Sequence, residues 1–359
     1  MEEEKKLKVL FISHTFPPIV GGVETQNYEL SNWLSKITDL KLIANRHRKL
    51  IPLFLPYAII RALFMMKKYD VLVLGSGILG IVGWFVKKIN KKPVVVVVHG
   101  LDLTWNNKLY QKLWVGFFLP KMDKLIAVGN ETIRAGIERN ISADKFVFIP
   151  NGVDVEKYKN NFSREKLDET IGLETDHKNV LLTSGRLAKR KGVAWFIRSV
   201  MPKLSDDFIY IAAGNGSDKD NISKAIEETK LDKRVFPLGY VTDPVRDMLF
   251  STCDLFVQPN IKIKGDMEGF GISVIEACAC EIPVLASRLE GLEDAIKEGQ
   301  NGFLVEPENA QAYAEKINEL FKDKTELKKF GRQARQFIME NYSWEIIAKK
   351  YLEEIRKNI

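Results

Sequence analysis

The segment Val94-Val-Val-Val-Val98-His99-Gly100 contains five consecutive valines followed by a histidine and a glycine. A strand with one face in solvent alternates apolar and polar residues, whereas a strand covered on both faces is apolar throughout. β-Branched residues also favour extended backbone. The valine run therefore predicts a strand inside a parallel sheet with helices on both sides, which is an α/β fold.

Similar apolar runs recur along the chain and alternate with longer amphipathic segments, as in proteins built from strand–helix–strand units. In the first half we expect strands at 8–13, 40–44, 71–74, 94–98, 124–128 and 145–149, with helices at 23–36, 77–88 and 131–139. In the second half we expect strands at 180–184, 208–213, 234–237, 255–258, 284–286 and 302–305, followed by helices between 310 and 359.

A break separates the two series. It consists of the turn-forming residues Pro150-Asn151-Gly152-Val153-Asp154 and a polar stretch from 154 to 178. The interruption favours two Rossmann-like domains over a single (β/α)8 barrel, which stays the alternative. We expect an N-terminal domain at 1–153 and a C-terminal domain at 154–342, with a last helix at about 343–359 packing back on the first.

Composition limits the class of protein. The chain has 359 residues and is 45% hydrophobic, which supports sizeable cores and argues against disorder. The cysteines Cys253, Cys278 and Cys280 are expected to be small buried side chains in a reducing compartment. Four histidines without paired spacing argue against a zinc site. The N-terminus lacks an apolar signal core, so we expect a cytoplasmic protein.

The net charge of +7 is unevenly distributed, because residues 40–101 contain eleven Lys or Arg and one acid, Asp70. A positive field of this kind attracts nucleic acid, anionic membrane or phosphorylated substrates. No nucleic-acid recognition motif accompanies it, so we expect no nucleic-acid partner. The apolar stretch 50–66 contains Pro52, Pro56 and Arg61 and is not expected to span a membrane. This stretch either contacts anionic lipid peripherally at the inner face of the membrane or forms an ordinary helix that faces the core.

The segment Val71-Leu-Val-Leu-Gly75-Ser-Gly77-Ile-Leu-Gly80 matches the dinucleotide-binding pattern of a strand running into G-x-G-x-x-G and a helix. Asp102 follows about twenty residues later, where the pattern expects a ribose-binding acid. The motif follows the third predicted strand instead of the first, and residues 99–101 separate the acid from its strand. Two interpretations remain, an NAD(P)-dependent oxidoreductase site or a tight strand–helix packing turn.

The first predicted strand of the second half ends in Ser184-Gly185-Arg186, and Lys191-Gly192 follow shortly before a helix. Ligands of open α/β sheets bind beyond the carboxyl ends of the strands. Arg186 offers a forked pair of donors and Lys191 a point charge, and together they suit a diphosphate. A solvated basic loop is the alternative interpretation of the same residues.

A second loop, after the predicted strand 255–258, ends in Glu268-Gly-Phe-Gly-Ile-Ser-Val-Ile-Glu276. Its small residues allow close approach of the backbone to a ligand, and the first turn of the following helix can hold an anion. Glu276 stands among apolar residues and needs hydrogen-bond partners if it is buried. Hydroxyl groups of a sugar or ribose are natural partners, whereas an exposed helix position is the alternative.

This Glu268-x7-Glu276 spacing resembles the E-x7-E motif of the retaining GT-B glycosyltransferases of family 4. Further motifs appear in that family's order and extend the resemblance over residues 7 to 345. These motifs are Gly21-Gly22-Val23-Glu24, His99-Gly100-Leu101-Asp102, Pro150-Asn151-Gly152-Val153-Asp154, Ser184-Gly185-Arg186 with Lys191-Gly192, Gly214-Asn215-Gly216 and Leu238-Gly239-Tyr240-Val241. The segment before Leu55 departs from the family in being short, basic and apolar, which leaves the acceptor undefined.

The resemblance implies two facing Rossmann-like domains with a central cleft. It implies that Glu276 binds the ribose, that Glu268 binds hexose hydroxyls, and that Phe270 and Gly271 offer backbone groups. The donor-binding residues so implied are Gly21, Gly22, Gly185, Arg186, Lys191, Gly214, Tyr240, Val241, Glu268, Gly269, Phe270, Gly271, Ile272 and Glu276. The residues assigned to catalysis are His99, Arg186, Lys191 and Glu268, and those assigned to the acceptor are His99 and Asp102.

The expected activity is retaining transfer of a hexosyl unit from a nucleoside-diphosphate sugar to a sugar, lipid-linked or small-molecule hydroxyl. The leaving diphosphate gains negative charge, which Arg186, Lys191 and the helix start near Gly271 can stabilise. Because we identify no Asp-x-Asp motif that would hold the diphosphate through a metal, we expect no metal and no cofactor besides the donor. An NAD(P)-dependent oxidoreductase, a non-catalytic nucleotide-sugar binder and a sugar-nucleotide epimerase remain as alternatives.

Overall fold

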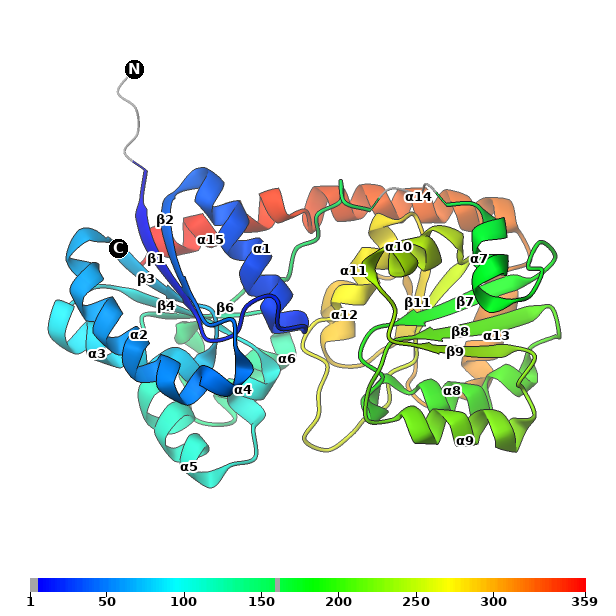
Figure 1. Ribbon diagram of the computed structural model, residues 1–359, viewed down its shortest axis with the longest axis horizontal. Helices are drawn as coiled ribbons and strands as arrows, with labels where there is room; N and C mark the ends of the chain where they lie inside the picture. The colour runs from blue at the N-terminus through cyan, green and yellow to red at the C-terminus, as the bar shows by residue number, and fades with distance from the viewer. Residues whose placement is uncertain (1–5, 159–161) are drawn as a thin grey trace, which may run out of the picture. The chain divides into compact units, whose positions relative to one another are not determined.

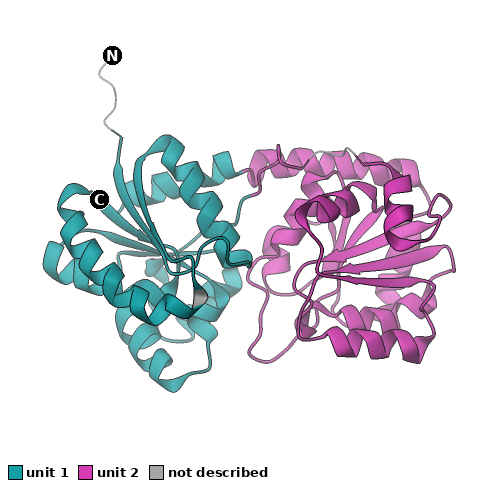
Figure 2. Cartoon of the chain, in the orientation of Figure 1, with its two compact units in different colours: residues 1–152, 344–359 teal, residues 153–343 magenta. Residues whose placement is uncertain are grey.

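The computed structural model describes residues 6–158 and 162–359 (Figure 1). The chain divides into two compact units, one formed by Met1–Gly152 with Trp344–Ile359 and the other by Val153–Ser343 (Figure 2). The sequence predicted that the chain passes from the first domain to the second between 153 and 154 and returns between 342 and 343. Each unit is an α/β layer structure with a parallel sheet, which confirms the predicted fold class.

The described residues of unit 1 form a six-stranded parallel sheet in the order β2-β1-β3-β4-β5-β6. The valine run is strand β4, and all five of its residues are buried, as a strand covered on both faces requires. The strands are β1 (Lys8–Ser13), β2 (Asp39–Ala44), β3 (Val71–Leu74), β4 (Val94–Val98), β5 (Lys124–Ala127) and β6 (Phe146–Phe148). The helices are α1 (Gly22–Ile37), α2 (Ile51–Met65), α3 (Gly80–Asn90), α4 (Gly100–Thr104), α5 (Lys108–Tyr110), α6 (Asn130–Ile137) and α15 (Trp344–Arg356).

Helices cover both faces of this sheet (Figure 1). On one face α1 lies beside α15, and their apolar residues share a core with alternate residues of the central strands. On the other face α2 and α3 pack together, next to the helical segment Gln111–Phe118. The alternation of side chains along each strand divides the core of unit 1 into these two layers.

The last helix, α15, completes unit 1 although 191 residues of the other unit precede it. Its buried side chains include Trp344, Ile347, Tyr351 and Ile355. The Trp344 ring lies directly against Gly152, where an added Cβ would come 2.6 Å from the ring. The last helix therefore supplies part of the first unit's core.

We predict that Trp344→Ala lowers the free energy of unfolding by about 3–5 kcal/mol, because it leaves a cavity in this core. Lys350→Ala on the exposed side of the same helix should change it by no more than about 0.5 kcal/mol. Urea denaturation followed by fluorescence and circular dichroism measures both. Equal stability of the two variants would show that α15 contributes little to the core.

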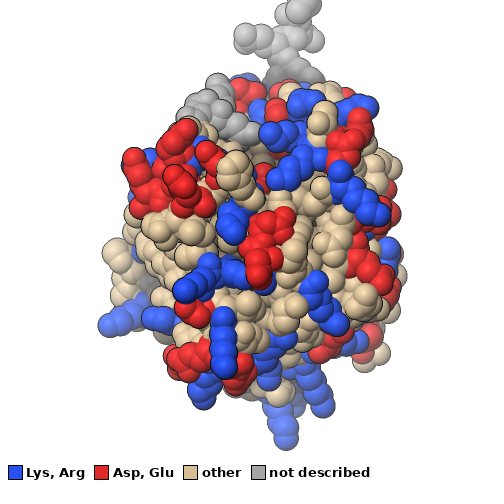
Figure 3. Space-filling model, turned by 90° about the vertical axis from the view of Figure 1, so that its right-hand side faces the viewer, with Lys and Arg blue, Asp and Glu red and all other residues tan. Residues whose placement is uncertain are grey.

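The described residues of unit 2 form a second six-stranded parallel sheet, in the order β12-β11-β10-β7-β8-β9. Acidic and basic side chains are interspersed over the face of this unit that Figure 3 shows. The strands are β7 (Asn179–Ser184), β8 (Phe208–Ala213), β9 (Val235–Gly239), β10 (Leu255–Gln258), β11 (Val284–Ser287) and β12 (Phe303–Val305). The helices are α7 (Arg164–Ile171), α8 (Val193–Ser199), α9 (Lys219–Thr229), α10 (Asp243–Thr252), α11 (Ile272–Ala279), α12 (Gly291–Ala295), α13 (Ala310–Leu320) and α14 (Lys324–Asn341).

The polar stretch between the two strand series is partly helical. Helix α7 lies within it, and Arg164 at its start forms an ion pair with Asp254 at 2.7 Å, which joins the stretch to unit 2. Cys253, Cys278 and Cys280 are buried, as the sequence predicted, and none of them is in a disulfide within the described residues. Burial raises the pKa of the Cys253 thiol well above its usual value, so this side chain stays a neutral thiol.

Candidate functional site: a charged loop cluster in unit 2 and a histidine pair in unit 1

The loops after β7 and β10 lie at the point where the unit 2 sheet reverses its direction of growth. The chain adds β8 and β9 on one side of β7 and then returns to add β10, β11 and β12 on the other. Such a reversal opens a crevice outside the strand ends, where ligands of open α/β sheets bind. Arg186 and Lys191 follow β7, and Glu268 and Glu276 follow β10. Topology thus brings together the residues that the sequence assigned to the donor.

Backbone contacts hold the two loops to one another. The Ile261 N–H donates to the Arg190 carbonyl at 2.9 Å. Gly192 has a φ of 67°, and a Cβ added there would overlap the carbonyl oxygen of Pro259. Only glycine satisfies both the left-handed backbone and the close approach. The backbone itself therefore positions Lys191 beside the loop after β10.

The loops after β8 and β9 join the same edge. The Gly214 N–H donates to the Gly239 carbonyl at 2.7 Å, and the Gly214 backbone lies against Gly185. Tyr240, directly after β9, is 69% exposed, while Val241 is half-buried. The exposed aromatic ring is available for stacking by a planar ligand.

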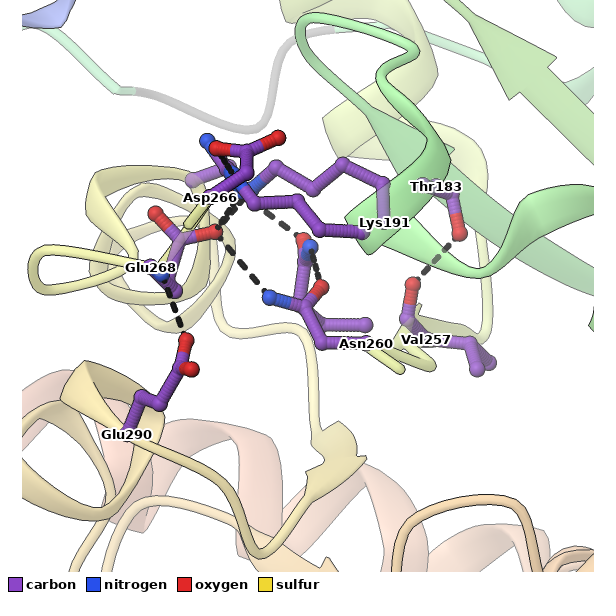
Figure 4. A network of polar contacts seen from close by, with 10 residues as sticks. Thr183, Lys191, Val257, Asn260, Asp266, Glu268 and Glu290 are labelled. Atoms are coloured by element: carbon purple, nitrogen blue, oxygen red, sulfur yellow. Dashed lines mark hydrogen bonds and ion pairs between the residues drawn. The ribbon is translucent and has the colours of Figure 1, made fainter. Parts of the chain in front are cut away.

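Glu268 is a buried carboxylate with three donors on one oxygen (Figure 4). Its Oε2 accepts from Lys191 Nζ at 2.5 Å, from Arg190 at 2.6 Å and from Asn260 at 3.1 Å. The described residues give no hydrogen bond to the other oxygen, Oε1. Glu268 is thus fixed through one oxygen and has acceptor capacity left on the second.

The charge state of Glu268 follows from two opposing effects. Burial alone would raise its pKa, but the positive charges of Lys191 and Arg190 outweigh burial and hold the pKa at about 2. The carboxylate is therefore ionised at neutral pH. A buried ion pair of this kind costs desolvation, which close contacts and additional hydrogen bonds offset.

The sequence missed Arg190 and Glu290, which complete the cluster. Arg190 bridges Glu268 and Asp266, with 3.0 Å to the latter. Glu290, before α12, accepts a 2.6 Å hydrogen bond from the Glu268 N–H. Its φ of 51° is a backbone conformation that costs a non-glycine residue about 1–3 kcal/mol. Arg190 stands in a basic run that a sequence can flag, whereas no pattern marks Glu290.

Helix α11 begins at Ile272, and the φ of 89° at the preceding Gly271 turns the chain sharply into the helix. The preceding Phe270 is only 2% exposed, so its side chain belongs to the core and its backbone alone can face a ligand. Gly269 lies in close contact with Gly291, and Ile272 is half-buried. The arrangement presents the first turn of a helix next to Glu268, which suits an anion.

Glu276, one and a half turns further, has protein partners that the sequence did not reveal. The Tyr158 hydroxyl donates to its Oε1 at 2.7 Å. Burial raises the pKa of Glu276, and the nearby Arg246 only partly offsets this. The carboxylate is thus held in a site that disfavours its charge, where additional donors are favourable.

Arg186 differs from Lys191 in being exposed. No described residue forms a hydrogen bond or ion pair with its side chain, so the guanidinium is available to a ligand. The expectation that the chain lacks an Asp-x-Asp motif is wrong, because Asp218-Lys-Asp220 stands at the start of α9, where Asp218 accepts from Asn221 at 3.1 Å. Among the described residues, no His, Cys, Asp or Glu group of three or more is arranged for a metal ion.

In unit 1 the reversal of the sheet lies between β1 and β3, and two histidines stand at this edge. His14 follows β1, and its Nδ1 lies 2.6 Å from the hydroxyl of Ser76 after β3. His99 follows β4, and its backbone N–H donates to Asp102 at 2.9 Å. The Nε2 of His99 is buried, and no described residue hydrogen-bonds to it. Burial lowers the pKa of both imidazoles, against the opposing charge of Asp102.

Gly21 and Gly22 precede and open α1 beside this edge. The position of a Cβ on Gly21 is filled by the carboxylate of Glu24, which accepts from the Thr15 hydroxyl at 2.7 Å. Asp102, which the dinucleotide interpretation would give to a ribose, instead caps the backbone of His99. Gly21 and Gly22, which the resemblance assigned to the donor, thus lie in unit 1 with His99 and Asp102, whereas the other predicted donor residues lie in unit 2.

The G-x-G-x-x-G segment after β3 is filled by protein. A Cβ on Gly75 would come 2.5 Å from Asn27, one on Gly77 2.8 Å from Asp102, and one on Gly80 3.2 Å from Leu119. A phosphate-binding glycine loop needs its backbone open to the ligand. The structure therefore favours the packing interpretation and removes the basis for a nicotinamide site there.

Two family models match the chain, one in each half. Residues 20–157 match Glycosyltransferase Family 4, and residues 164–337 match Glycosyl transferases group 1. The chain belongs to the GT-B glycosyltransferases of family 4. The motifs that carried the resemblance fall within these matches.

Relatives extend over nearly the whole of this glycosyltransferase. An uncharacterised glycosyltransferase of Methanocaldococcus jannaschii is 26% identical over 94% of this chain and 88% of its own. The GDP-mannose-dependent monoacylated alpha-(1-6)-phosphatidylinositol monomannoside mannosyltransferase of Corynebacterium glutamicum is 23% identical over 96% of each chain. The structure of HepE from Anabaena in complex with UDP and glucose has a TM-score of 0.76 and 21% identity, over 98% of this chain and 99% of that chain.

The pairing of Lys191 with Glu268 predicts strong energetic coupling. Lys191→Met and Glu268→Gln should each destabilise the glycosyltransferase, and the double variant should be more stable than their sum by about 1–3 kcal/mol. The control is the exposed pair Lys349–Glu345, whose coupling should be no more than about 0.5 kcal/mol. Denaturant titrations give both cycles, and equal coupling in the two pairs would contradict the buried ion pair.

The lowered pKa values of His14 and His99 predict acid sensitivity. The ordinary pKa of histidine is 6.5. When the pH falls below this value, the two histidines bind protons in the unfolded chain but stay neutral in the folded chain, so the free energy of unfolding decreases. Each histidine contributes at most about 1.4 kcal/mol per pH unit. Denaturation at pH 7.5, 6.5 and 5.5 should show a shallower fall for His14→Gln than for the control His177→Asn, which alters an exposed residue. Identical slopes would overturn this assignment.

Proposed function

We propose that this glycosyltransferase moves a hexosyl unit from a nucleoside-diphosphate sugar to a hydroxyl acceptor with retention of anomeric configuration and without a metal ion. The observation that carries the proposal is Glu268. Its Oε2 is held by Lys191, Arg190 and Asn260, while its Oε1 retains capacity for a sugar hydroxyl. A carboxylate fixed in this way is preorganised to orient the donor sugar.

The remaining donor contacts are assigned from the same edge of the sheet. The ribose hydroxyls donate to Glu276, whose half-buried charge gains by additional donors. The base lies against the loop of Tyr240 and Val241. The complexed HepE structure contains UDP and the mannosyltransferase relative uses GDP-mannose, so both bases occur among the similar proteins.

Catalysis requires that the enzyme stabilise the departing diphosphate. Negative charge grows on it as the glycosidic bond breaks, and preorganised positive charge lowers the barrier. Arg186, the N–H groups at the start of α11 and Lys191, whose ammonium has further donors besides the one given to Glu268, supply that charge. Gly185, where an added Cβ would meet no atom within 4 Å, leaves room for the donor near its backbone.

The acceptor is assigned to unit 1, to a sugar, lipid-linked or small-molecule hydroxyl. His99 offers a buried Nε2 that no described residue uses, and Asp102 fixes the backbone of that histidine. With its pKa lowered by burial, the imidazole is neutral at pH 7 and can exchange a hydrogen bond with the reacting groups. Attack by the acceptor on the face that the diphosphate leaves gives retention.

Glu276→Gln tests the donor assignment, because stability and binding should move in opposite directions. The raised pKa means that ionised Glu276 destabilises the folded protein at pH values above 4.5. The variant should therefore melt at a higher temperature without ligand and lose about 1.5–3 kcal/mol of nucleotide binding, since its hydrogen bonds to a charged group are lost. Thermal shift with UDP, GDP and NADH measures both effects.

A variant that binds nucleotides as the wild type does would remove Glu276 from the site. Stabilisation by NADH but not by UDP or GDP would instead favour the oxidoreductase interpretation.

Arg186→Ala should lower turnover by about 10²–10³-fold, in the range found for single charge-stabilising donors, with little change in stability. The matched control is Lys189→Ala, which removes an exposed charge from the same loop and should leave the rate within about threefold. Transfer from UDP-glucose and GDP-mannose, followed by chromatography with and without EDTA, measures the rates. Loss of activity in EDTA with rescue by Mg²⁺ or Mn²⁺ would refute metal independence.

A further inference from the structure

Helix α2 carries an apolar stripe that nothing in the described chain covers. Four large residues of this helix are 51–73% exposed. They are separated by four, three and four positions, so they lie along one side of the helix. They are Leu53, Tyr57, Ile60 and Phe64, which we call the α2 stripe.

The opposite side of α2 serves the core in the ordinary way. Phe54, Ala58 and Ala62 are buried against the sheet of unit 1. The helix is therefore apolar on two sides, and only one of them is needed for folding. Single exposed apolar residues are common, but a contiguous exposed row marks a surface that meets another apolar phase or molecule.

More exposed apolar residues lie on the same side of unit 1. Helix α3 packs beside α2, and the segment 111–118 packs beside α3. Together with the connection that precedes it, this layer exposes further large side chains. They are Ile89, Leu101, Trp105, Leu109 and Phe117.

The charge around the stripe is almost entirely positive. Residues 40–121 contain fourteen Lys or Arg and two acids. Both acids are bound to backbone N–H groups, Asp70 to that of Lys8 and Asp102 to that of His99. Exposed basic side chains flank α2 at both ends, Arg46 and Lys49 before it and Lys67 and Lys68 after it.

A recess of about 500 Å³ lies next to the start of α2. Arg46 and Lys49 line it together with Pro18, Ile19 and Leu50, so it combines positive charge with apolar walls. An anionic headgroup with an attached acyl chain has this combination of properties. The lining residues are Pro18, Ile19, Arg46, His47, Lys49 and Leu50.

We propose that unit 1 docks on an anionic lipid surface through the α2 stripe and its basic flanks. An apolar row between lysines and arginines is the pattern of a helix that lies in the interface of a bilayer. A second copy of this chain fits poorly, because it would bring two positive surfaces together. No helix in the described part of the chain has the length and apolar run to cross a bilayer, so docking is peripheral.

Vesicle sedimentation without nucleotide tests the proposal independently of the proposed transferase activity. The full chain should sediment with vesicles of phosphatidylcholine and phosphatidylglycerol at low salt and stay in solution with phosphatidylcholine alone. Raising NaCl from 50 to 500 mM should weaken binding, since salt screens the basic residues. Ile60→Ser with Phe64→Ser should lower the bound fraction about tenfold, because two interfacial side chains are lost.

Matched controls separate the stripe from general effects. Ile137→Ser with Met339→Ser removes two exposed apolar residues elsewhere and should leave vesicle binding unchanged. Lys67→Gln with Lys68→Gln should weaken binding about tenfold or more, whereas Lys322→Gln with Lys328→Gln, both exposed in unit 2, should not. Thermal melting with and without UDP verifies that every variant is folded.

Failure of the wild-type chain to sediment with phosphatidylglycerol vesicles at low salt would overturn the proposal. Equal binding by the stripe variant and its control would overturn the role of α2. Analytical ultracentrifugation distinguishes self-association, because a dimer that Ile60→Ser with Phe64→Ser dissolves would assign the stripe to a second copy instead.

Discussion

A buried carboxylate with two cations on one oxygen organises the C-terminal half of this glycosyltransferase. Lys191 and Arg190 come from the loop after β7, and Glu268 comes from the loop after β10. Charges removed from water must find partners at close range, so the two loops cannot separate without leaving an unpaired ion. The constraint fixes the crevice at the reversal of the sheet and leaves Glu268 Oε1 in a defined position.

Other features of the same edge oppose stability. Glu290 adopts a positive φ and accepts the Glu268 N–H, and Glu276 holds its charge in a half-buried position where desolvation raises its pKa. Strain and unfavourable charge persist where function selects them. A ligand that supplies donors to the Glu276 carboxylate would relieve part of this cost.

The sequence predicted most of the fold, because buried parallel strands are short apolar runs and their order along the chain is visible. It also predicted which loops gather at the sheet edge, since strand ends of a parallel sheet share one side. It could not predict that Lys191 pairs with Glu268, that Tyr158 reaches Glu276 or that Glu290 caps Glu268, because these contacts join residues 22 to 118 positions apart. The glycines after β3 show the opposite error, because their spacing predicts a nucleotide-binding loop, whereas neighbouring side chains fill the space that the nucleotide would need.

The central claim is that Glu268 holds the donor sugar through its second oxygen while its first stays bound to cations. Calorimetric titration of UDP against UDP-glucose, and of GDP against GDP-mannose, tests it in the wild type and in Glu268→Gln. The account predicts that the wild type binds one sugar nucleotide more tightly than its nucleotide, and that the variant keeps nucleotide affinity but loses this increment. A variant that retains the full increment would contradict it.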